Sequence, residues 1–234
     1  MKIHIDQKAV KRNGIIGKIL RWTSLGCMLI GLFAVFSQEV AENPRLFSIF
    51  FTIMLLGIIL SSVSSYFITR FGKSPRPDEL IDKAFKGLDD RYHIFHYKSS
   101  IPHLLISPSG VWSITPTFVD GEIQFDKNNN KWVHKKSSII NRFLSKEYFP
   151  NPFNDLKSHN KDFQKVLNAS STKSNIELNS LIILMNKNAN LNGENDIGNI
   201  LILPFDKVKD KYRKLAKGNE KQPEINETLV EIYS

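Results

Sequence analysis

The stretch of residues 101–123, IPHLLISPSGVWSITPTFVDGEI, decides the fold of the region around it. An extended apolar run comes first, and the turn-forming triplet at residues 108–110 separates it from a second run. Within the second run hydroxyl side chains recur at alternate positions, so Thr115 and Thr117 would lie on one face of a strand. The pattern predicts a β-meander.

The segments on either side of this meander alternate between helix and strand. Apolar side chains at 3.6-residue spacing predict a helix over residues 78–88, and the Asn151-Pro152 pair opens another that reaches residue 167. Short apolar runs predict further strands at residues 92–97, 132–133, 178–185 and 200–203, and a last helix reaches about residue 215. This order predicts the α/β (α+β) class, with a mixed sheet flanked by helices.

Two apolar segments near the N-terminus predict a membrane anchor. Residues 46–69, LFSIFFTIMLLGIILSSVSSYFIT, carry no charge and are long enough to cross the hydrocarbon core as a helix. Residues 15–36 form a second span, with Lys18 and Arg21 near its start, where long side chains reach the headgroups. A cleaved signal peptide is the alternative for the first span, but no A-x-A-like site follows it. We therefore expect residues 1–71 to stay attached as a transmembrane helical hairpin.

The distribution of charge predicts how this hairpin is oriented. The loop at residues 37–45 carries Glu39 and Glu42 against Arg45, whereas the two outer flanks are basic. The basic flanking residues are Lys2, Lys8, Lys11, Arg12, Lys18 and Arg21 before or within the first span, and Arg70, Lys73 and Arg76 after the second. The positive-inside rule then predicts a two-span protein of the cell membrane, with both termini and the soluble domain in the cytoplasm.

Small residues in the second span leave two packing arrangements open. Gly57, Ser61 and Ser65 recur at four-residue spacing, which allows close approach of a second helix. That helix is either the first span of the same chain or a span from a second copy, which would give a homodimer. Cys27 is the one cysteine of the chain, so no internal disulfide is expected.

The rest of the chain divides into a linker, a domain and a tail. Prolines stiffen a linker at residues 72–77, a domain covers residues 78–217, and residues 218–234 form a polar tail in which 228–233 could add a short strand. The formal net charge of the chain is +9, but residues 72–234 hold twenty-four Lys and Arg against twenty Asp and Glu. Such a mildly basic domain does not require a large nucleic-acid footprint.

The central stretch resembles the nuclease-related domain (NERD) family, whose members have a restriction-endonuclease-like fold. The resemblance rests on Ile101, His103, the Pro108-x-Gly110-Val111 turn, the strand at residues 112–114, and Gly121. Family members are mostly bacterial, are often joined to membrane segments, and are thought to act in DNA processing. The resemblance therefore implies a nuclease-like domain on a membrane anchor.

Three residues depart from the family pattern at positions that carry its chemistry. Pro102 stands where the family has Asp, Thr115 where it has an acidic residue, and Thr117 where it has Lys. Asp155 also replaces the Gln that usually follows the Asn-Pro pair. Nucleases of this kind hold Mg²⁺ through carboxylates, and neither proline nor a neutral hydroxyl replaces that charge. We therefore expect no catalytic residue, bound metal or cofactor at this degenerate motif.

Other clusters of chemically active residues have simpler interpretations. His93 and His96 would point to opposite faces of one strand, which argues against a zinc site with His103. Four acids, Asp89, Asp90, Asp120 and Glu122, could in principle rebuild a carboxylate site, but the sequence places most of them in turns. Solvated turn acids are the favoured interpretation.

Two functional hypotheses remain from the sequence. In the first, the chain is not an enzyme but a membrane-anchored, catalytically inactive nuclease-like domain. It would serve as a binding or scaffolding module for an unidentified protein partner or nucleic acid. In the alternative, the chain is a divalent-metal-dependent nuclease whose acidic residues have been relocated.

Overall fold

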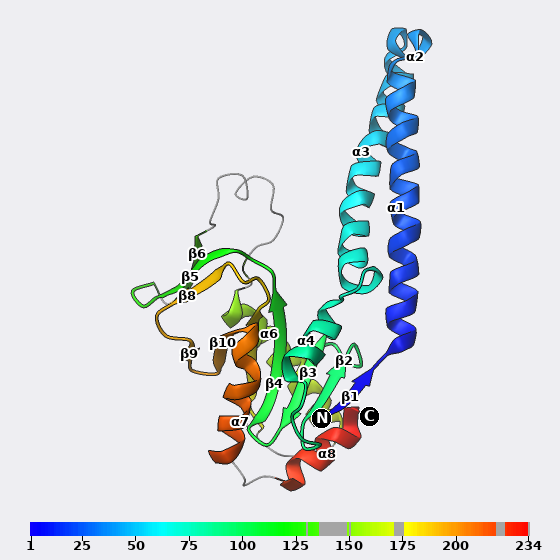
Figure 1. Cartoon of the computed structure of the whole chain (residues 1–234). Coiled ribbons are helices and arrows are strands. Elements are labelled where there is room, and N and C mark those ends of the chain that lie inside the picture. Colours follow the sequence, from blue (N-terminus) through cyan, green and yellow to red (C-terminus); the bar gives the residue numbers. More distant parts are fainter. Residues whose placement is uncertain (130, 136–148, 150, 171–175, 219–222, 234) are drawn as a thin grey trace. The chain divides into compact units, whose positions relative to one another are not determined.

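The chain forms two compact units, each of which is described here by itself. One is Asp6–Glu79, and the other combines Met1–Ile5 with Leu80–Ser234 (Figure 1). The computed structural model describes residues 1–129, 131–135, 149, 151–170, 176–218 and 223–233. The division expected from the sequence has other bounds, with an anchor at residues 1–71 and a tail at 218–234. Residues 219–222 and 234 of that tail lie outside the described residues.

The first unit is an antiparallel helical hairpin. Helix α1 (Gln7–Val35) is joined through the short α2 (Gln38–Glu42) to α3 (Pro44–Phe67), and a π-helical turn (Ile68–Gly72) follows. The Asp6 carboxylate caps α1 by accepting from the Ala9 N–H, and the Asn43 side chain caps α3. Both long helices are apolar enough to cross a membrane and are mostly exposed. They are therefore unlike the buried core helix of a soluble protein.

Glycine and serine residues hold the two long helices of the hairpin together. The Ser24 hydroxyl donates to the Gly57 carbonyl (2.8 Å), and the Ser64 hydroxyl donates to the Gly17 carbonyl (2.9 Å). Gly57 thus packs inside the hairpin, whereas Ser61 and Ser65 are exposed. Gly57 therefore contacts the first span of the same chain, which supports the intramolecular arrangement. Homodimerisation stays a prediction.

The second unit is built on a seven-stranded mixed sheet in the order β1-β2-β3-β4-β7-β10-β9. Its strands are β1 (Lys2–Ile5), β2 (His93–His96), β3 (His103–Ser107), β4 (Gly110–Thr117), β7 (Leu178–Leu184), β9 (Asp196–Ile197) and β10 (Ile200–Pro204). The central strands β4, β7 and β10 run parallel, and β3 pairs antiparallel with β4. The expected mixed sheet with flanking helices is confirmed.

A second sheet of three strands has the order β6-β5-β8. It contains β5 (Gly121–Asp126), β6 (Lys131–Lys135) and β8 (Ala189–Asn192). The predicted meander therefore holds only for β3 and β4, because the chain turns into this second sheet at Gly121, whose φ is +91°. Only glycine adopts such a backbone angle readily.

Two sets of helices cover the two faces of the main sheet. Helices α4 (Pro77–Phe85) and α7 (Val208–Gly218, preceded by a 3₁₀ turn at Phe205–Lys207) pack on one face. Helices α6 (Pro152–Ala169) and α8 (Pro223–Tyr233) pack on the other, which we call the α6 face. Residues 228–233 are thus helical rather than the short strand considered from sequence. Leu229 and Tyr233 are buried there against apolar neighbours, and this burial favours a helix docked on the sheet.

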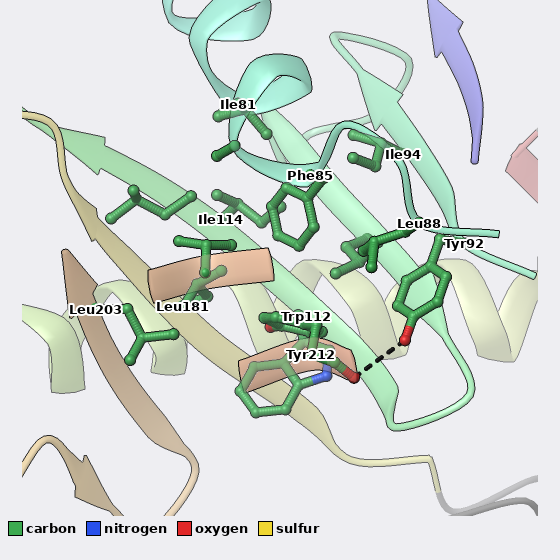
Figure 2. Packing of buried hydrophobic residues seen from close by; sticks show 14 of the residues in the cluster. Ile81, Phe85, Leu88, Tyr92, Ile94, Trp112, Ile114, Leu181, Leu203 and Tyr212 are labelled. Carbon is green, nitrogen blue, oxygen red and sulfur yellow. Dashed lines mark hydrogen bonds between the residues drawn. The ribbon is translucent and has the colours of Figure 1, made fainter. Parts of the chain in front are cut away.

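The core under α4 and α7 is the most aromatic part of the structure. Phe85 of α4, Trp112 of β4 and Tyr212 of α7 meet edge to face, with ring centroids of Phe85 and Trp112 at 5.1 and 5.5 Å from that of Tyr212 (Figure 2). The Tyr92 hydroxyl donates to the Tyr212 carbonyl at 3.1 Å. Burial raises the pKa of Tyr212 well above its ordinary value. Its own hydroxyl has no hydrogen-bond partner among the described residues.

A matched pair of glycine substitutions tests the hairpin interface. A Cβ atom at Gly31 would lie 2.6 Å from the Cβ of Met54 and 2.9 Å from the Phe50 carbonyl oxygen, whereas a Cβ at Gly26 meets nothing within 4 Å. We expect Gly31→Ala to destabilise the hairpin by about 1–3 kcal/mol through overpacking. Gly26→Ala should be neutral or stabilise it by up to about 1 kcal/mol, because alanine favours helix. Thermal loss of helical circular dichroism in detergent measures both, and equal midpoints would contradict the close packing.

Two tyrosine substitutions test the aromatic core in opposite directions. Tyr92→Phe removes a buried hydrogen bond, so we expect it to lower the free energy of unfolding by about 1 kcal/mol. Tyr212→Phe removes a buried hydroxyl that lacks a described partner, so it should leave stability unchanged or raise it. Urea unfolding of the full chain in detergent, followed by tryptophan fluorescence, gives both values. A larger loss for Tyr212→Phe than for Tyr92→Phe would contradict the packing described.

Candidate functional site

Thr115 and Thr117 lie on the α6 face of the main sheet. In the parallel pair β4–β7, Thr115 is opposite Ile182 and Thr117 is opposite Leu184. Paired residues share a face, and Ile182 and Leu184 belong to the apolar cluster on which Phe153 of α6 packs. The two threonines therefore face the same layer of the domain, as the alternation of the sequence requires.

Pro102 comes next to these threonines by the register of β3. Leu104 of β3 is opposite Ser113 of β4, so continuing the antiparallel register by two residues brings Pro102 opposite Thr115. The Pro102 carbonyl accepts from the Tyr97 N–H at 2.9 Å, which closes the loop between β2 and β3. By this extension of the register, Pro102 in the segment before β3 comes near Thr115 and Thr117 of β4, so the three positions at which the sequence predicts departures from the family pattern are neighbours.

Helix α6 brings two titratable residues to the same layer. Leu156 faces the sheet, and Asp155 and His159 lie on one flank of the helix because they are four residues apart. The other flank faces a surface hollow lined by Asn160 and by Asn199, which precedes β10. Asp155 and His159 are therefore on the flank of α6 that faces away from β10. In the strand order, this flank is on the side of β4.

The environment of this pair shifts both of its pKa values. Burial raises the pKa of Asp155, and the charge of His159 partly opposes that shift. Burial lowers the pKa of His159, against the opposing influence of Asp155 and Asp162. Burial thus favours the neutral form of both groups, which keeps an imidazole available to accept a proton.

His159 is a candidate site residue that was not predicted from the sequence. Asp155 was identified only as a departure from the family pattern. The signal was present in the spacing, because a histidine four residues after Asp155 on a sheet-packed helix occupies the same flank. Helical periodicity applied to the polar residues, as well as to the apolar ones, would have found it.

A buried chain of hydrogen bonds occupies the opposite face. His96 Nδ1 lies 2.8 Å from His103 Nδ1, and His96 Nε2 lies 3.0 Å from an Asp82 carboxylate oxygen of α4. His93 instead contacts His4 of β1, with 3.3 Å between His93 Nδ1 and His4 Nε2. His93 and His96 thus point to opposite faces, as predicted, and His103 belongs to a polar contact inside the fold.

The four other acids considered from sequence lie in turns or at the surface. Asp89 forms an ion pair with Arg91, and Asp90 is exposed beside the Met1 ammonium group. The Asp120 carbonyl, in the turn before β5, is hydrogen-bonded to the His134 ring. Glu122 is exposed on the three-stranded sheet opposite Lys135. These positions agree with turn and surface roles.

The residues at the threonine positions do not fit a magnesium ion of the family type. Pro102 has no ligand atom in its side chain, and the hydroxyls of Thr115 and Thr117 are neutral. Among the residues that the structure describes, no three His, Cys, Asp or Glu side chains are grouped so that they could hold a metal ion. We therefore derive no chemical step through a metal at this place.

Comparison with known proteins gives one match. Residues 78–185 match the model of the nuclease-related domain family. The match covers α4, β2 to β7 and α6, which include the α6 face and the Pro102, Thr115 and Thr117 positions. No curated protein and no solved structure matches the chain.

The match corrects one expectation from the sequence. We expected from three substitutions that the chain is not an enzyme, but the family assignment points to a nuclease-like domain and gives no sign that catalytic residues are lost. The physical reason is that the catalytic groups of a site need not come from β4 and from the segment before β3, where Thr115 and Pro102 lie. Another element packed on the same face, such as α6 with Asp155, can supply them. Residues 78–185 of this chain therefore match a nuclease-related domain.

Proposed function

We propose that this chain is a membrane-anchored nuclease-related protein whose domain binds nucleic acid on the cytoplasmic side and hydrolyses its phosphodiester backbone. The family assignment supports the nuclease-like character of residues 78–185. Substrate, anchoring and orientation are parts of the proposal.

The observation that carries the proposal is the half-buried Asp155–His159 pair on the flank of α6 toward β4. Phosphodiester hydrolysis needs a group that accepts a proton from the attacking oxygen and donors that stabilise the charge developing on the phosphate. His159 suits the first role, because burial lowers its pKa and keeps its imidazole neutral near pH 7. The Asp155 carboxyl would hold that ring in place from the preceding turn of α6.

The threonines suit the second role. Their hydroxyls donate hydrogen bonds without bringing a negative charge, so they can contact phosphate oxygens that a carboxylate would repel. Thr115 is partly exposed, whereas Thr117 is buried at 6 % relative exposure. Thr115 is therefore the better candidate for direct contact with a substrate.

Exposure of the hairpin supports the proposed anchor. The large apolar side chains of α1 and α3 are mostly exposed, among them Phe33 at 72 % and Ile59 at 61 %. Water is a poor environment for so large a contiguous apolar surface, whereas lipid is a good one. The pairing of β1 with β2 in one sheet further supports the proposal that both ends of the hairpin lie on the same side of the membrane.

Cleavage assays with the full chain in lipid nanodiscs test the enzymatic proposal. Plasmid, single-stranded DNA and RNA are each incubated with the protein, without metal and with Mg²⁺ or Mn²⁺. We expect cleavage of at least one substrate, and a loss of about 100-fold or more in Asp155→Asn and His159→Gln, the size typical of general acid–base groups. Asp210→Asn on α7 is the matched control and should keep full activity, because Asp210 is exposed on the other face.

The pattern of results separates the hypotheses. Cleavage only with Mg²⁺ or Mn²⁺, lost on changing Asp120 or Glu122, would favour the metal-dependent nuclease with relocated acids over the α6 pair. Retention of nucleic acid without cleavage would contradict the proposed hydrolysis but agree with the proposed binding. If the protein neither cuts nor retains nucleic acid, the proposed substrate class is wrong.

The proposed orientation has a separate test. A reporter that is active only outside the cytoplasm, fused after Ser234, should give no signal, because the basic flanks favour retention of both ends in the cytoplasm. The same reporter inserted in the loop between α1 and α3, at residue 40, should be active. An active C-terminal fusion would exclude this topology.

A further inference from the structure

The packing of the hairpin fixes which residues of α1 and α3 lie at the same depth. The Ser24 hydroxyl binds the Gly57 carbonyl, and a Cβ at Gly31 would touch Met54. At the other end of the hairpin, a Cβ at Gly17 would lie 2.9 Å from the Cβ of Phe67. These contacts set an antiparallel register in which residue 17 is level with residues 67 and 68.

This register shows where the basic residues of α1 stand relative to the apolar span of α3. Residues 46–69 carry no charge, and as a helix of 24 residues they extend over about 36 Å, which is slightly more than the roughly 30 Å of hydrocarbon. The span ends at Arg70. In this register Lys18 is level with about residue 67, roughly 5 Å deeper than Arg70, and Arg21 lies about 5 Å deeper again.

Within the described ranges of the chain, no acidic side chain is paired with any of these three cations. In the described part of the chain, no ion pair joins Lys18, Arg21 or Arg70 to an Asp or Glu. Glu39 and Glu42 are at the far end of the hairpin, and Asp78 and Glu79 pair with Arg76. A guanidinium group near hydrocarbon is costly without a partner, so the counter-charge has to come from the surroundings.

Aromatic residues accompany the cations at the same level. Trp22 is 72 % exposed beside Arg21 in the sequence. The Arg70 guanidinium lies 4.5 Å from the centre of the Tyr66 ring, and Arg70 Nη1 donates to the Tyr66 hydroxyl at 2.9 Å. Tryptophan and tyrosine prefer the headgroup level of a bilayer, and lysine and arginine side chains reach it from within.

We propose that Lys18, Arg21 and Arg70 form a binding surface for the phosphate group of anionic phospholipids at the cytoplasmic end of the hairpin. The inference rests on the proposed membrane anchoring. Arginine binds phosphate through two parallel N–H donors, and a lipid with net negative charge also compensates the three cations. Nucleic acid carries the same phosphate chemistry but cannot enter the apolar layer in which Arg21 lies, so the lipid is the better fit.

Lipid retention by the purified full chain tests this surface. The protein is reconstituted in equal parts of phosphatidylcholine and phosphatidylglycerol, extracted with its nearest lipids, and the ratio of the two lipids is measured by mass spectrometry. We expect enrichment of phosphatidylglycerol in the wild type. The change of Lys18, Arg21 and Arg70 together to Gln should remove most of it, since each basic residue near an anionic surface contributes up to about fivefold in affinity.

The matched control removes three positive charges elsewhere. Lys86, Lys207 and Lys214 are exposed basic residues of the sheet-containing unit, and their joint change to Gln should leave the enrichment intact. Arg21→Lys keeps the charge and should keep most of the enrichment. Equal loss in the control variant, or no enrichment in the wild type, overturns the proposal.

Two further measurements distinguish a lack of lipid binding by the three cations from a lack of membrane anchoring by the hairpin. Flotation with vesicles of phosphatidylcholine alone tests anchoring, and a wild-type chain that does not float with them rejects the anchor and this surface together. If the triple variant does not insert, the salt dependence of lipid enrichment in the wild type tests the proposal instead. That enrichment should fall at least threefold between 0.05 M and 0.5 M salt, because salt screens contacts at the headgroup level. An enrichment that does not change with salt overturns the proposal.

Discussion

The parallel pairing of β4 with β7 is the interaction on which the rest of the sheet-containing unit depends. It joins seven residue pairs, from Val111 opposite Leu178 to Thr117 opposite Leu184. Alternate pairs face opposite layers, so one strand pair supplies Ile114 and Leu181 to the aromatic core and the threonines to the α6 face. A shift of one residue in this register would exchange the two sets. The apolar core therefore fixes where the candidate site lies, although the two share no side chain.

The pairing of β1 with β2 places a second constraint on the whole chain. Residues on either side of the hairpin belong to one sheet, since Ile3 is opposite Ile94 and Ile5 is opposite His96. The hairpin is thus inserted within the fold in chain order rather than appended before it. Because the edge strand β1 comes from the segment before the hairpin, folding of the sheet depends on the position of residues 2–5. The sequence analysis could not find this link, because four residues before a long apolar helix carry too little pattern to predict a strand.

Elements with strong local signals were predictable from the sequence, and those decided by tertiary contacts were not. The helix at residues 152–169 has an Asn cap, an early proline and regular apolar spacing, and strand β7 is an apolar run, so both were found within two residues. The segment at residues 228–233 reads equally as strand or helix. Burial of Leu229 and Tyr233 on the sheet decides for helix, and that information lies in other parts of the chain. In the same way, the contact between His96 and His103 depends on strand register, which spacing alone does not reveal.

The three departures at Pro102, Thr115 and Thr117 illustrate how far a motif can carry a functional conclusion. A motif read along the chain records only which residues occupy the family's positions, whereas chemistry depends on which groups meet in space. Here α6 comes to the same face as the threonines, and it carries a carboxyl group with a raised pKa and an imidazole with a lowered one. Burial creates both shifts, and it follows from the packing of Phe153, Leu156 and Phe163 against the sheet. A site assembled in this way would use the fold of the nuclease-related domain while taking its reactive groups from a helix, so the residues at the three motif positions do not by themselves imply loss of activity.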